Sequence, residues 1–400
     1  MHRRCFLKYL AGVGVMPAFR RSALAADEKA DAKTLRLIEA SRPSRLKRLP
    51  EDFCARVGAT HTGGKYHLTQ KPFLIEGAEK LLELGTRLGK LWFNPDQIAQ
   101  SYPFNSQWGT YRNLVELAKA DYFEQVFALP FSTFCLETHS PVERAWKSDQ
   151  PESFYQAVTA EYRDLTAYFY KKFFQRTTTI VLQHWEGDWM LRGNDKKWNP
   201  PATDWPRRCE RMQRWLAARQ AGVTKARAEF GPGAKCRVAH ASEVNRVADI
   251  WKGLPTVTDK VLPGVELDMV SYSCYDGMKD PLTLWKCIEE IRKHARTGPL
   301  FGKGAVFLGE IGIPENSRPD RLTERWDEFM GAALAANVLY VIHWELYCNE
   351  FNPKVEPPPT PPVKRGEDMR GFWLVRPDGS LSESGRYFGA LWKRAGSRSP

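Results

Sequence analysis

The stretch "TIVLQHWEGDWML", residues 179–191, indicates how this chain folds. It opens with a short apolar run that has the length and the β-branched residues of a buried strand. The run ends in Trp185 and Glu186, and Asp188 and Trp189 follow directly. Acids beside large aromatic rings at the end of such a strand predict that the strand opens onto a cleft.

Seven further apolar runs have the same character. They are residues 54–59, 90–93, 133–137, 236–240, 267–273, 305–309 and 339–343. Helical spacing separates them, as in Phe154, Val158, Tyr162 and Leu165, which would share one face of a helix. Eight strands alternating with helices, without a repeated sequence, predict an α/β fold with a single (β/α)8 TIM barrel. An open doubly wound sheet is the alternative, but no GxGxxG follows the first strand.

The first 26 residues have the composition of a targeting segment. Arg3 and Arg4 precede a short apolar run, and Ala23 and Ala25 fit a small-residue cleavage site. This segment resembles a twin-arginine signal peptide, which implies contact with the twin-arginine export machinery and a periplasmic or extracellular location in a bacterium. Residues 27–50 are charged and poor in aromatic residues, which predicts an N-terminal arm.

The C-terminal part of the chain is predicted to stay within the barrel domain, residues 51–395. The proline-rich stretch 351–368 leaves too few residues after it for a second stable domain. We therefore expect a long loop over the barrel mouth, followed by a return segment and a last helix within 371–392. Asp378 and Gly379 would form the turn between them.

The formal net charge is +12, and the basic residues are spread among acids. This pattern indicates a solvated surface and argues against a nucleic-acid partner, while an acidic polysaccharide would also suit a basic surface. The eight cysteines form no CxxC pair and no cluster with zinc spacing, so neither a disulfide framework nor a zinc site is expected. We expect a monomer.

Catalytic groups of a barrel project from the carboxyl ends of its strands. Glu186 follows the fourth predicted strand, and Glu310 follows the seventh, roughly opposite across the mouth. Two such carboxyl groups can flank a glycosidic bond: one protonates the departing oxygen, and the other attacks the anomeric carbon or activates water. Trp185 and Trp189 would supply flat surfaces for sugar rings.

Four features in strand order resemble the clan A retaining glycoside hydrolases, such as the family 5 cellulases. They are the acid after strand four, "GEIG" (309–312) after strand seven, a tyrosine after strand six and a tryptophan after strand eight. The resemblance spans most of residues 52–395. It implies a carbohydrate substrate, Glu186 as acid/base and Glu310 as nucleophile, with no metal or other cofactor. It also implies that Tyr275 hydrogen-bonds the nucleophile and that Trp344 forms the floor under the reacting sugar.

One position departs from that family. Its members usually carry asparagine just before the acid, where it holds the sugar 2-hydroxyl, and this chain has Trp185 there. The contact would then come from His184, Asn94 or His240. Further candidates for substrate binding are His61 after the first strand, together with Asp188 and Glu345, which with Glu243 are rivals or supporting partners of the two main acids.

Two other functions remain open from the sequence. A barrel that binds carbohydrate without cleaving it would be compatible with the missing asparagine. A metal-assisted barrel hydrolase would use the histidines at strand ends, namely His139, His184, His240 and His343, although these lack the i, i+4 spacing of a helical metal site.

Overall fold

The computed structural model describes residues 18–193 and 198–397. Most of the predicted signal peptide, residues 1–17, lies outside the described residues. The boundary at residue 26 stays a prediction.

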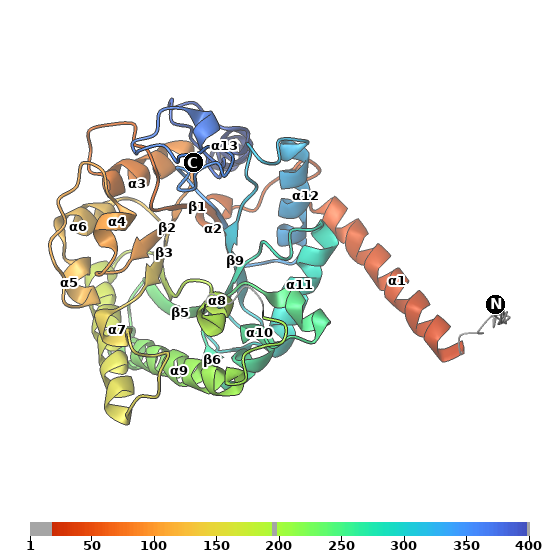
Figure 1. The fold of residues 1–400 in the computed structure, drawn as a ribbon, viewed down its shortest axis with the longest axis horizontal. Coiled ribbons are helices and arrows are strands. Elements are labelled where there is room, and N and C mark those ends of the chain that lie inside the picture. Colours follow the sequence, from red (N-terminus) through yellow and green to blue (C-terminus); the bar gives the residue numbers. More distant parts are fainter. Residues whose placement is uncertain (1–17, 194–197, 398–400) are drawn as a thin grey trace, which may run out of the picture.

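Within the described residues, eight parallel strands close into a barrel in the order β1-β10-β9-β7-β5-β4-β3-β2 (Figure 1). Each of the eight predicted apolar runs supplies one strand, which confirms the (β/α)8 TIM barrel. The strands are β1 (Val57–His61), β2 (Leu88–Phe93), β3 (Thr133–Thr138), β4 (Thr179–Gln183), β5 (Arg237–Val244), β7 (Met269–Ser273), β9 (Val306–Ile311) and β10 (Val341–His343). A separate two-stranded sheet pairs β6 (Glu266–Leu267) with β8 (Arg296–Thr297).

Helices surround the barrel and bury their apolar faces against it. The longer ones are α3 (Phe73–Leu84), α6 (Asp121–Ala128), α7 (Glu152–Phe173), α9 (Trp205–Phe230), α11 (Pro281–His294), α12 (Leu322–Ala335) and α13 (Glu383–Gly396). The short helical segments are α2 (Phe53–Arg56), α4 (Ile98–Ser101), α5 (Leu114–Ala118), η1 (Pro141–Glu143), α8 (Gly187–Arg192), η2 (Val247–Lys252), α10 (Val257–Lys260), η3 (Leu262–Gly264) and η4 (Gly366–Asp368). In α7 Val158, Tyr162 and Leu165 of the predicted stripe are buried, and Phe154 is half-buried. Pro281 occupies the first turn of α11, as its fixed φ favours.

A bulge in β9 shapes the site. Tyr272 and Ser273 of β7 pair with Leu308 and Glu310, so Gly309 is an extra residue in β9. A Cβ atom at Gly309 would lie 1.8 Å from Ser271 Oγ and 2.5 Å from Glu243 Oε2. Only glycine fits between these side chains, which accounts for the first residue of the "GEIG" motif.

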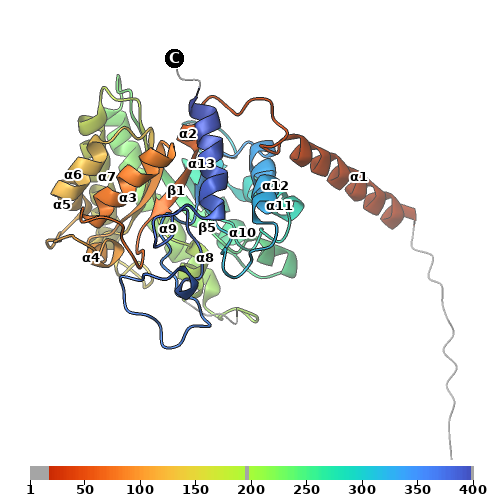
Figure 2. The same ribbon diagram turned by 90° about the horizontal axis from the view of Figure 1, so that it is seen from above.

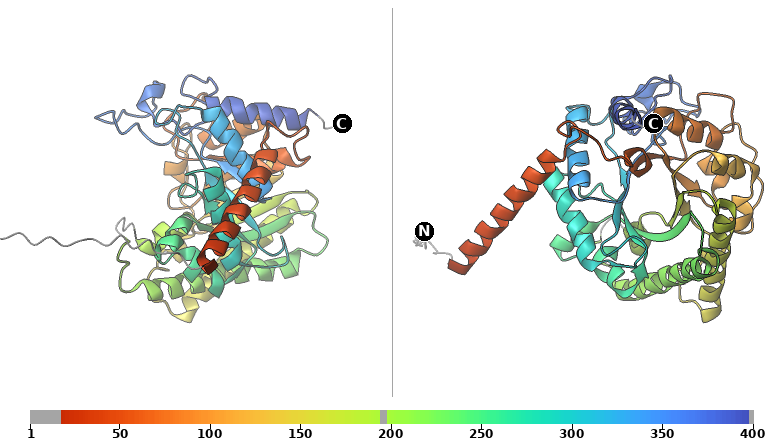
Figure 3. Two further views of the ribbon diagram at one scale, coloured as in Figure 1. Left: turned by 90° about the vertical axis from the view of Figure 1, so that its right-hand side faces the viewer. Right: turned by 180° about the vertical axis from the view of Figure 1, so that it is seen from behind.

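The predicted N-terminal arm is largely helical. Helix α1 (Ala18–Ala40) projects away from the barrel (Figures 2 and 3). Its C-terminal end is anchored, since Ile38 is buried and Arg42 Nε lies 2.9 Å from Asp327 Oδ2 of α12. Among the described helices, none is both long enough and apolar enough to cross a bilayer.

The C-terminal segment packs against the barrel. Val363, in the proline-rich loop, donates its N–H to Lys65 O at 2.8 Å. Arg376 and Ser380 then close the turn at Asp378–Gly379, where Gly379 has φ +81°. Helix α13 follows and packs on the barrel.

Candidate active site

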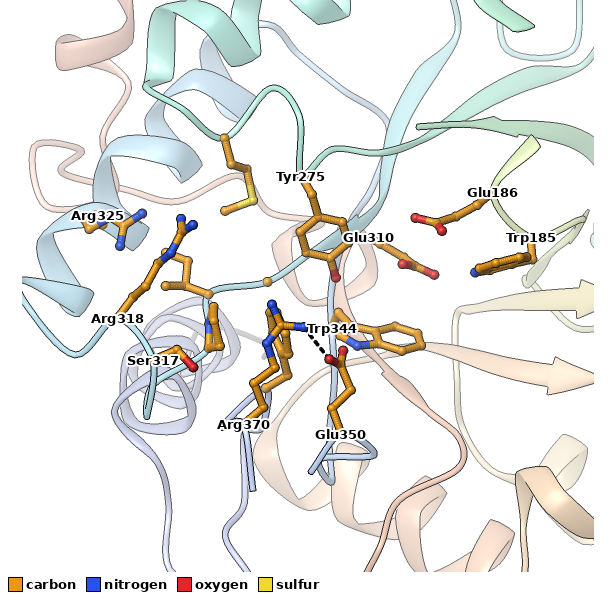
Figure 4. A pocket seen from close by; sticks show the side chains of 15 residues that line it. Trp185, Glu186, Tyr275, Glu310, Ser317, Arg318, Arg325, Trp344, Glu350 and Arg370 are labelled. Atoms are coloured by element: carbon orange, nitrogen blue, oxygen red, sulfur yellow. Dashed lines mark hydrogen bonds and ion pairs between the residues drawn. The ribbon is translucent and has the colours of Figure 1, made fainter. Parts of the chain in front are cut away.

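A cavity of about 530 Å³ opens at the carboxyl ends of the strands (Figure 4). Its volume lies in the range of small-molecule sites, roughly 300–1,000 Å³. Glu186, Glu310, Trp185, Tyr275 and Trp344 all line it, so five of the predicted site residues come together there. The other lining residues are Met278, Gly312, Ile313, Pro314, Ser317, Arg318, Arg325, Glu350, Arg370 and Phe372.

The two glutamates meet at Ser273. Its hydroxyl lies 2.7 Å from Glu186 Oε1 and 3.3 Å from Glu310 Oε2. The sum of these distances, 6.0 Å, is an upper limit for the separation of those two carboxylate oxygens. Retaining glycosidases hold their carboxyl groups about 5–5.5 Å apart, and inverting ones about 6.5–9.5 Å. The arrangement therefore fits the retaining geometry.

Lys90 of β2 lies beneath these acids, fully buried, and is not among the site residues predicted from the sequence. Its Nζ lies 3.0 Å from Glu310 Oε1 and 3.3 Å from Glu243 Oε2. Burial alone would lower the pKa of Lys90, but the two carboxylates raise it, so the ammonium is charged. The signal in the sequence was a lysine within an otherwise apolar strand segment, because a buried lysine requires a negative partner.

Glu243 supports the site from below and does not line the cavity. Its carboxylate accepts hydrogen bonds from Ser271 Oγ at 2.7 Å, Gln183 Nε2 at 3.0 Å and the N–H of Glu186 at 3.1 Å. With Lys90 as a further partner, both oxygens of Glu243 are engaged. Glu243 therefore contacts the groups around the two lining acids from outside the cavity lining.

The environment gives the two lining acids different proton affinities. Burial, followed by the charge of Glu310, raises the pKa of Glu186 strongly. Burial also raises the pKa of Glu310, but Lys90 offsets part of that rise. Near neutral pH the pair therefore holds its proton on Glu186 and its negative charge on Glu310. This distribution is the one required of a general acid and a nucleophile.

The aromatic residues divide into two groups. Trp185 is 39% exposed and Tyr275 37%, and the Trp344 ring packs 5.5 Å from that of Trp92 beside the cavity. Among the described residues, Tyr275 makes no hydrogen bond to Glu310, in contrast to what the resemblance implies; Ser273 makes a hydrogen bond to Glu310. Trp189 is not among the residues that line the cavity, and the guanidinium of Arg192 is stacked over its ring.

The other predicted substrate contacts lie away from the cavity lining. The His61 ring is buried and bonds Phe73 O, while His240 faces Gln220 of α9, outside the barrel. Asp188 is buried and accepts backbone N–H groups, including that of Val257 at 2.8 Å. Asn94 and Glu345 also lie outside the cavity lining. Asn94 Oδ1 accepts the N–H of Asp96, and the buried Glu345 accepts the N–H of Asn349. Strand-end position alone did not distinguish these structural roles from substrate contact.

The histidines considered for a metal site do not converge. His184 Nε2 lies 2.9 Å from Ser242 Oγ, and His343 packs between Trp326 and Phe388. Over residues 18–193 and 198–397, no group of three histidine, cysteine or acidic residues is arranged to hold a metal ion. Arg192, close to Glu186 in sequence, pairs with Asp249 at 3.0 Å.

Comparison with known proteins gives similarity in structure alone. No protein-family model matches the sequence, and no curated protein matches it. A β-glucosidase from Thermotoga maritima in complex with cyclophellitol is 10% identical with a TM-score of 0.52, over 88% of this chain and 100% of that one. A β-glycosidase from Pyrococcus horikoshii is 10% identical with a TM-score of 0.51, over 87% of this chain and 95% of that one. A family 5 glycoside hydrolase from Bifidobacterium longum, in complex with Manβ1-4GlcNAc, is 16% identical with a TM-score of 0.50, over 86% of this chain and 79% of that one. The structural neighbours are clan A glycoside hydrolases, and this chain shares their fold.

Proposed function

We propose that this protein is a retaining glycoside hydrolase that cleaves a poly- or oligosaccharide, with Glu186 as acid/base and Glu310 as nucleophile. The observation that carries the proposal is the convergence of the two carboxyl groups on Ser273, within 6.0 Å at most, in a cavity lined by exposed aromatic rings. The different environments of the two acids support the same assignment of roles.

The reaction proceeds in two displacements. The carboxylate of Glu310 attacks the anomeric carbon and forms a glycosyl ester, while Glu186 donates its proton to the departing oxygen. Glu186, now ionised, then takes a proton from water, and that water cleaves the ester and releases Glu310. Lys90 keeps Glu310 ionised and oriented before attack, and Ser273 holds the two acids in register. Trp344 and Trp185 provide surfaces for sugar rings on either side.

The experiment that tests this assignment is covalent trapping. Wild-type protein is incubated with a panel of 2-deoxy-2-fluoro glycosides and sugar epoxides, and the labelled peptide is identified by mass spectrometry. We expect an ester on Glu310. Glu186→Gln should slow turnover of substrates with poor leaving groups most strongly, with partial rescue by azide, because azide needs no general base. A matched control is Glu243→Gln, which should leave the site of labelling unchanged.

Two results would count against the proposal. A label on another acid would reassign the nucleophile. Sugar binding without label or turnover, across the whole panel, would favour a carbohydrate-binding barrel that has lost catalysis, the function that tryptophan in place of asparagine at position 185 leaves open.

We also propose that the protein is exported. The support comes from the sequence, through Arg3, Arg4 and the alanines before residue 26. Replacing both arginines with lysine should retain the protein in the cytoplasm, and N-terminal sequencing of the exported form should find a start near residue 26. Export that survives this replacement would contradict the twin-arginine route.

A further inference from the structure

The charges that line the cavity are unevenly distributed. Glu186 and Trp185 lie at one end, and Arg318 and Arg325 lie at the other, with Glu310 between them (Figure 4). A third arginine, Arg370, lies between these ends and pairs with a carboxylate that lines the same cavity.

Arg370 pairs with Glu350, and the two residues flank the proline-rich loop; the dashed line in Figure 4 marks the contact. Arg318 and Arg325 differ from it. Among the residues that the structure describes, neither guanidinium has a carboxylate within 4.0 Å, and neither donates a side-chain hydrogen bond. Two positive side chains therefore line the cavity without a paired carboxylate; Arg318 is exposed, Arg325 is half-buried, and Glu328 acts on Arg325 only from beyond 4.0 Å.

The half-buried position of Arg325 makes its charge unfavourable without a close partner. Arg325 lies in the first turn of α12 and is partly buried, and burial followed by the nearby charge of Arg318 lowers its pKa. Like charges close together repel, and a partly buried cation without a partner lowers the free energy of unfolding. Because no carboxylate pairs with either guanidinium among the described residues, an anionic ligand in the cavity would supply the compensating charge.

The guanidinium group has a specific chemistry of recognition. Its planar N–H donors match the two oxygens of a carboxylate and the oxygens of a sulfate, and bidentate pairs of this kind are strong and directional. Ser317, which lines the same end of the cavity, adds a hydroxyl donor.

We propose that the cavity accepts an anionic saccharide, whose carboxylate or sulfate group is bound by Arg318 and Arg325 at the end opposite Glu186. This inference rests on the proposed function for the sugar chain, and it adds the substrate class. A uronic acid residue and a sulfated sugar share the chemistry that the two arginines recognise.

The test measures binding rather than turnover. Glu310→Gln protein, which should not turn substrate over, is titrated by calorimetry with uronate-containing oligosaccharides, their carboxyl-reduced neutral counterparts and sulfated oligosaccharides. We expect at least one anionic series to bind about tenfold or more tightly than its neutral counterpart, with a preference that weakens as salt increases. A preference for the uronate or for the sulfated series identifies the group.

Variants locate the preference. Arg318→Gln and Arg325→Gln, each added to Glu310→Gln, should each reduce the preference for the anionic over the neutral oligosaccharide about tenfold. The matched control is Arg321→Gln, because Arg321 lies on the same segment, is exposed and already pairs with Glu324. Arg325→Gln should also melt no lower than its parent, since it removes a repulsion.

Three outcomes overturn the inference. These are equal or tighter binding of neutral oligosaccharides, equal losses in the Arg321→Gln control, and no binding of any anionic series. If wild-type protein forms the Glu310 ester with a neutral sugar only, the proposed function stands and this inference fails. If anionic sugars bind through the two arginines but are never cleaved, this inference stands and the proposed function fails.

Discussion

Replacing Lys90 with methionine tests the electrostatic core of the site most directly. Methionine has a similar length and packs well in apolar surroundings, so the change removes a charge with little loss of volume. Lys90 is fully buried, with its Nζ 3.0 Å from Glu310 and 3.3 Å from Glu243. Without it, two buried carboxylates face each other with no cation between them.

The magnitude follows from the distance to Glu310. With an effective dielectric constant of about 20, a charge pair at 3.0 Å is worth about 5 kcal/mol. Since one pKa unit corresponds to about 1.4 kcal/mol, the loss could raise the pKa of Glu310 by at most about 4 units. Breaking a buried ion pair from one side lowers the free energy of unfolding by about 3–5 kcal/mol.

The assay is urea-induced unfolding of four proteins: the wild type, Lys90→Met, Glu243→Gln and the double variant. Lys90→Met should lose about 3–5 kcal/mol at pH 7. The double variant restores the wild-type net charge of the cluster, so it should be more stable than Lys90→Met alone. The coupling between the two sites should exceed about 1 kcal/mol.

The pH dependence supplies a second check. In Lys90→Met, the folded-state pKa of Glu310 should rise further above its ordinary value of 4.5. A carboxyl group with a raised pKa favours folding fully only below its unfolded pKa, and that contribution is lost as the pH rises through the folded pKa. The stability deficit of Lys90→Met should therefore shrink as the pH falls from 7 toward 4.5. Additive effects of the two substitutions, or a deficit independent of pH, would refute the reasoning.

Three further predictions follow from single residues. Gly309→Ala forces a Cβ to within 1.8 Å of Ser271 Oγ, so it should lower the melting temperature and abolish covalent labelling, whereas an intact label would show that β9 relaxes freely. Glu186→Gln removes a carboxyl group whose pKa is raised. The variant should therefore become more stable than the wild type as the pH rises above 4.5, by at most about 1.4 kcal/mol per pH unit. A constant difference in the free energy of unfolding between pH 5 and 8 would contradict this. Trp185→Ala should weaken oligosaccharide binding by about 1 kcal/mol in calorimetry and leave the melting temperature unchanged, because the ring is 39% exposed; unchanged affinity would remove it from the site.

The proposed activity should follow a bell-shaped dependence on pH. It rises as Glu310 loses its proton and falls as Glu186 loses its proton, because only the form with one ionised and one protonated acid can react. In Glu186→Gln, the basic limb should disappear from the rate of glycosyl-ester formation with an activated substrate. A basic limb that persists would assign the general acid to another group.

The alternation of apolar runs with helical spacing was sufficient to predict the barrel, because strand and helix periodicities are local properties of the chain. The same pattern placed Glu186 and Glu310, since a barrel presents strand ends at one rim. The pattern also selected His61, His240 and Asp188, which lie outside the cavity lining. Strand-end residues face the cavity, the barrel core or the surrounding helices according to local twist, which the sequence does not reveal.

What the sequence determined by itself was therefore the number and order of the strands and the two acids near their carboxyl ends. The tertiary structure decided which groups touch those acids: Lys90 beneath Glu310, Ser273 between the pair, and Arg318 and Arg325 at the far end of the cavity. These contacts join residues far apart along the chain, and they depend on barrel closure, the β9 bulge and the path of the loops. Local periodicity carries no information about such distances, so their electrostatic consequences became visible only once the barrel was closed.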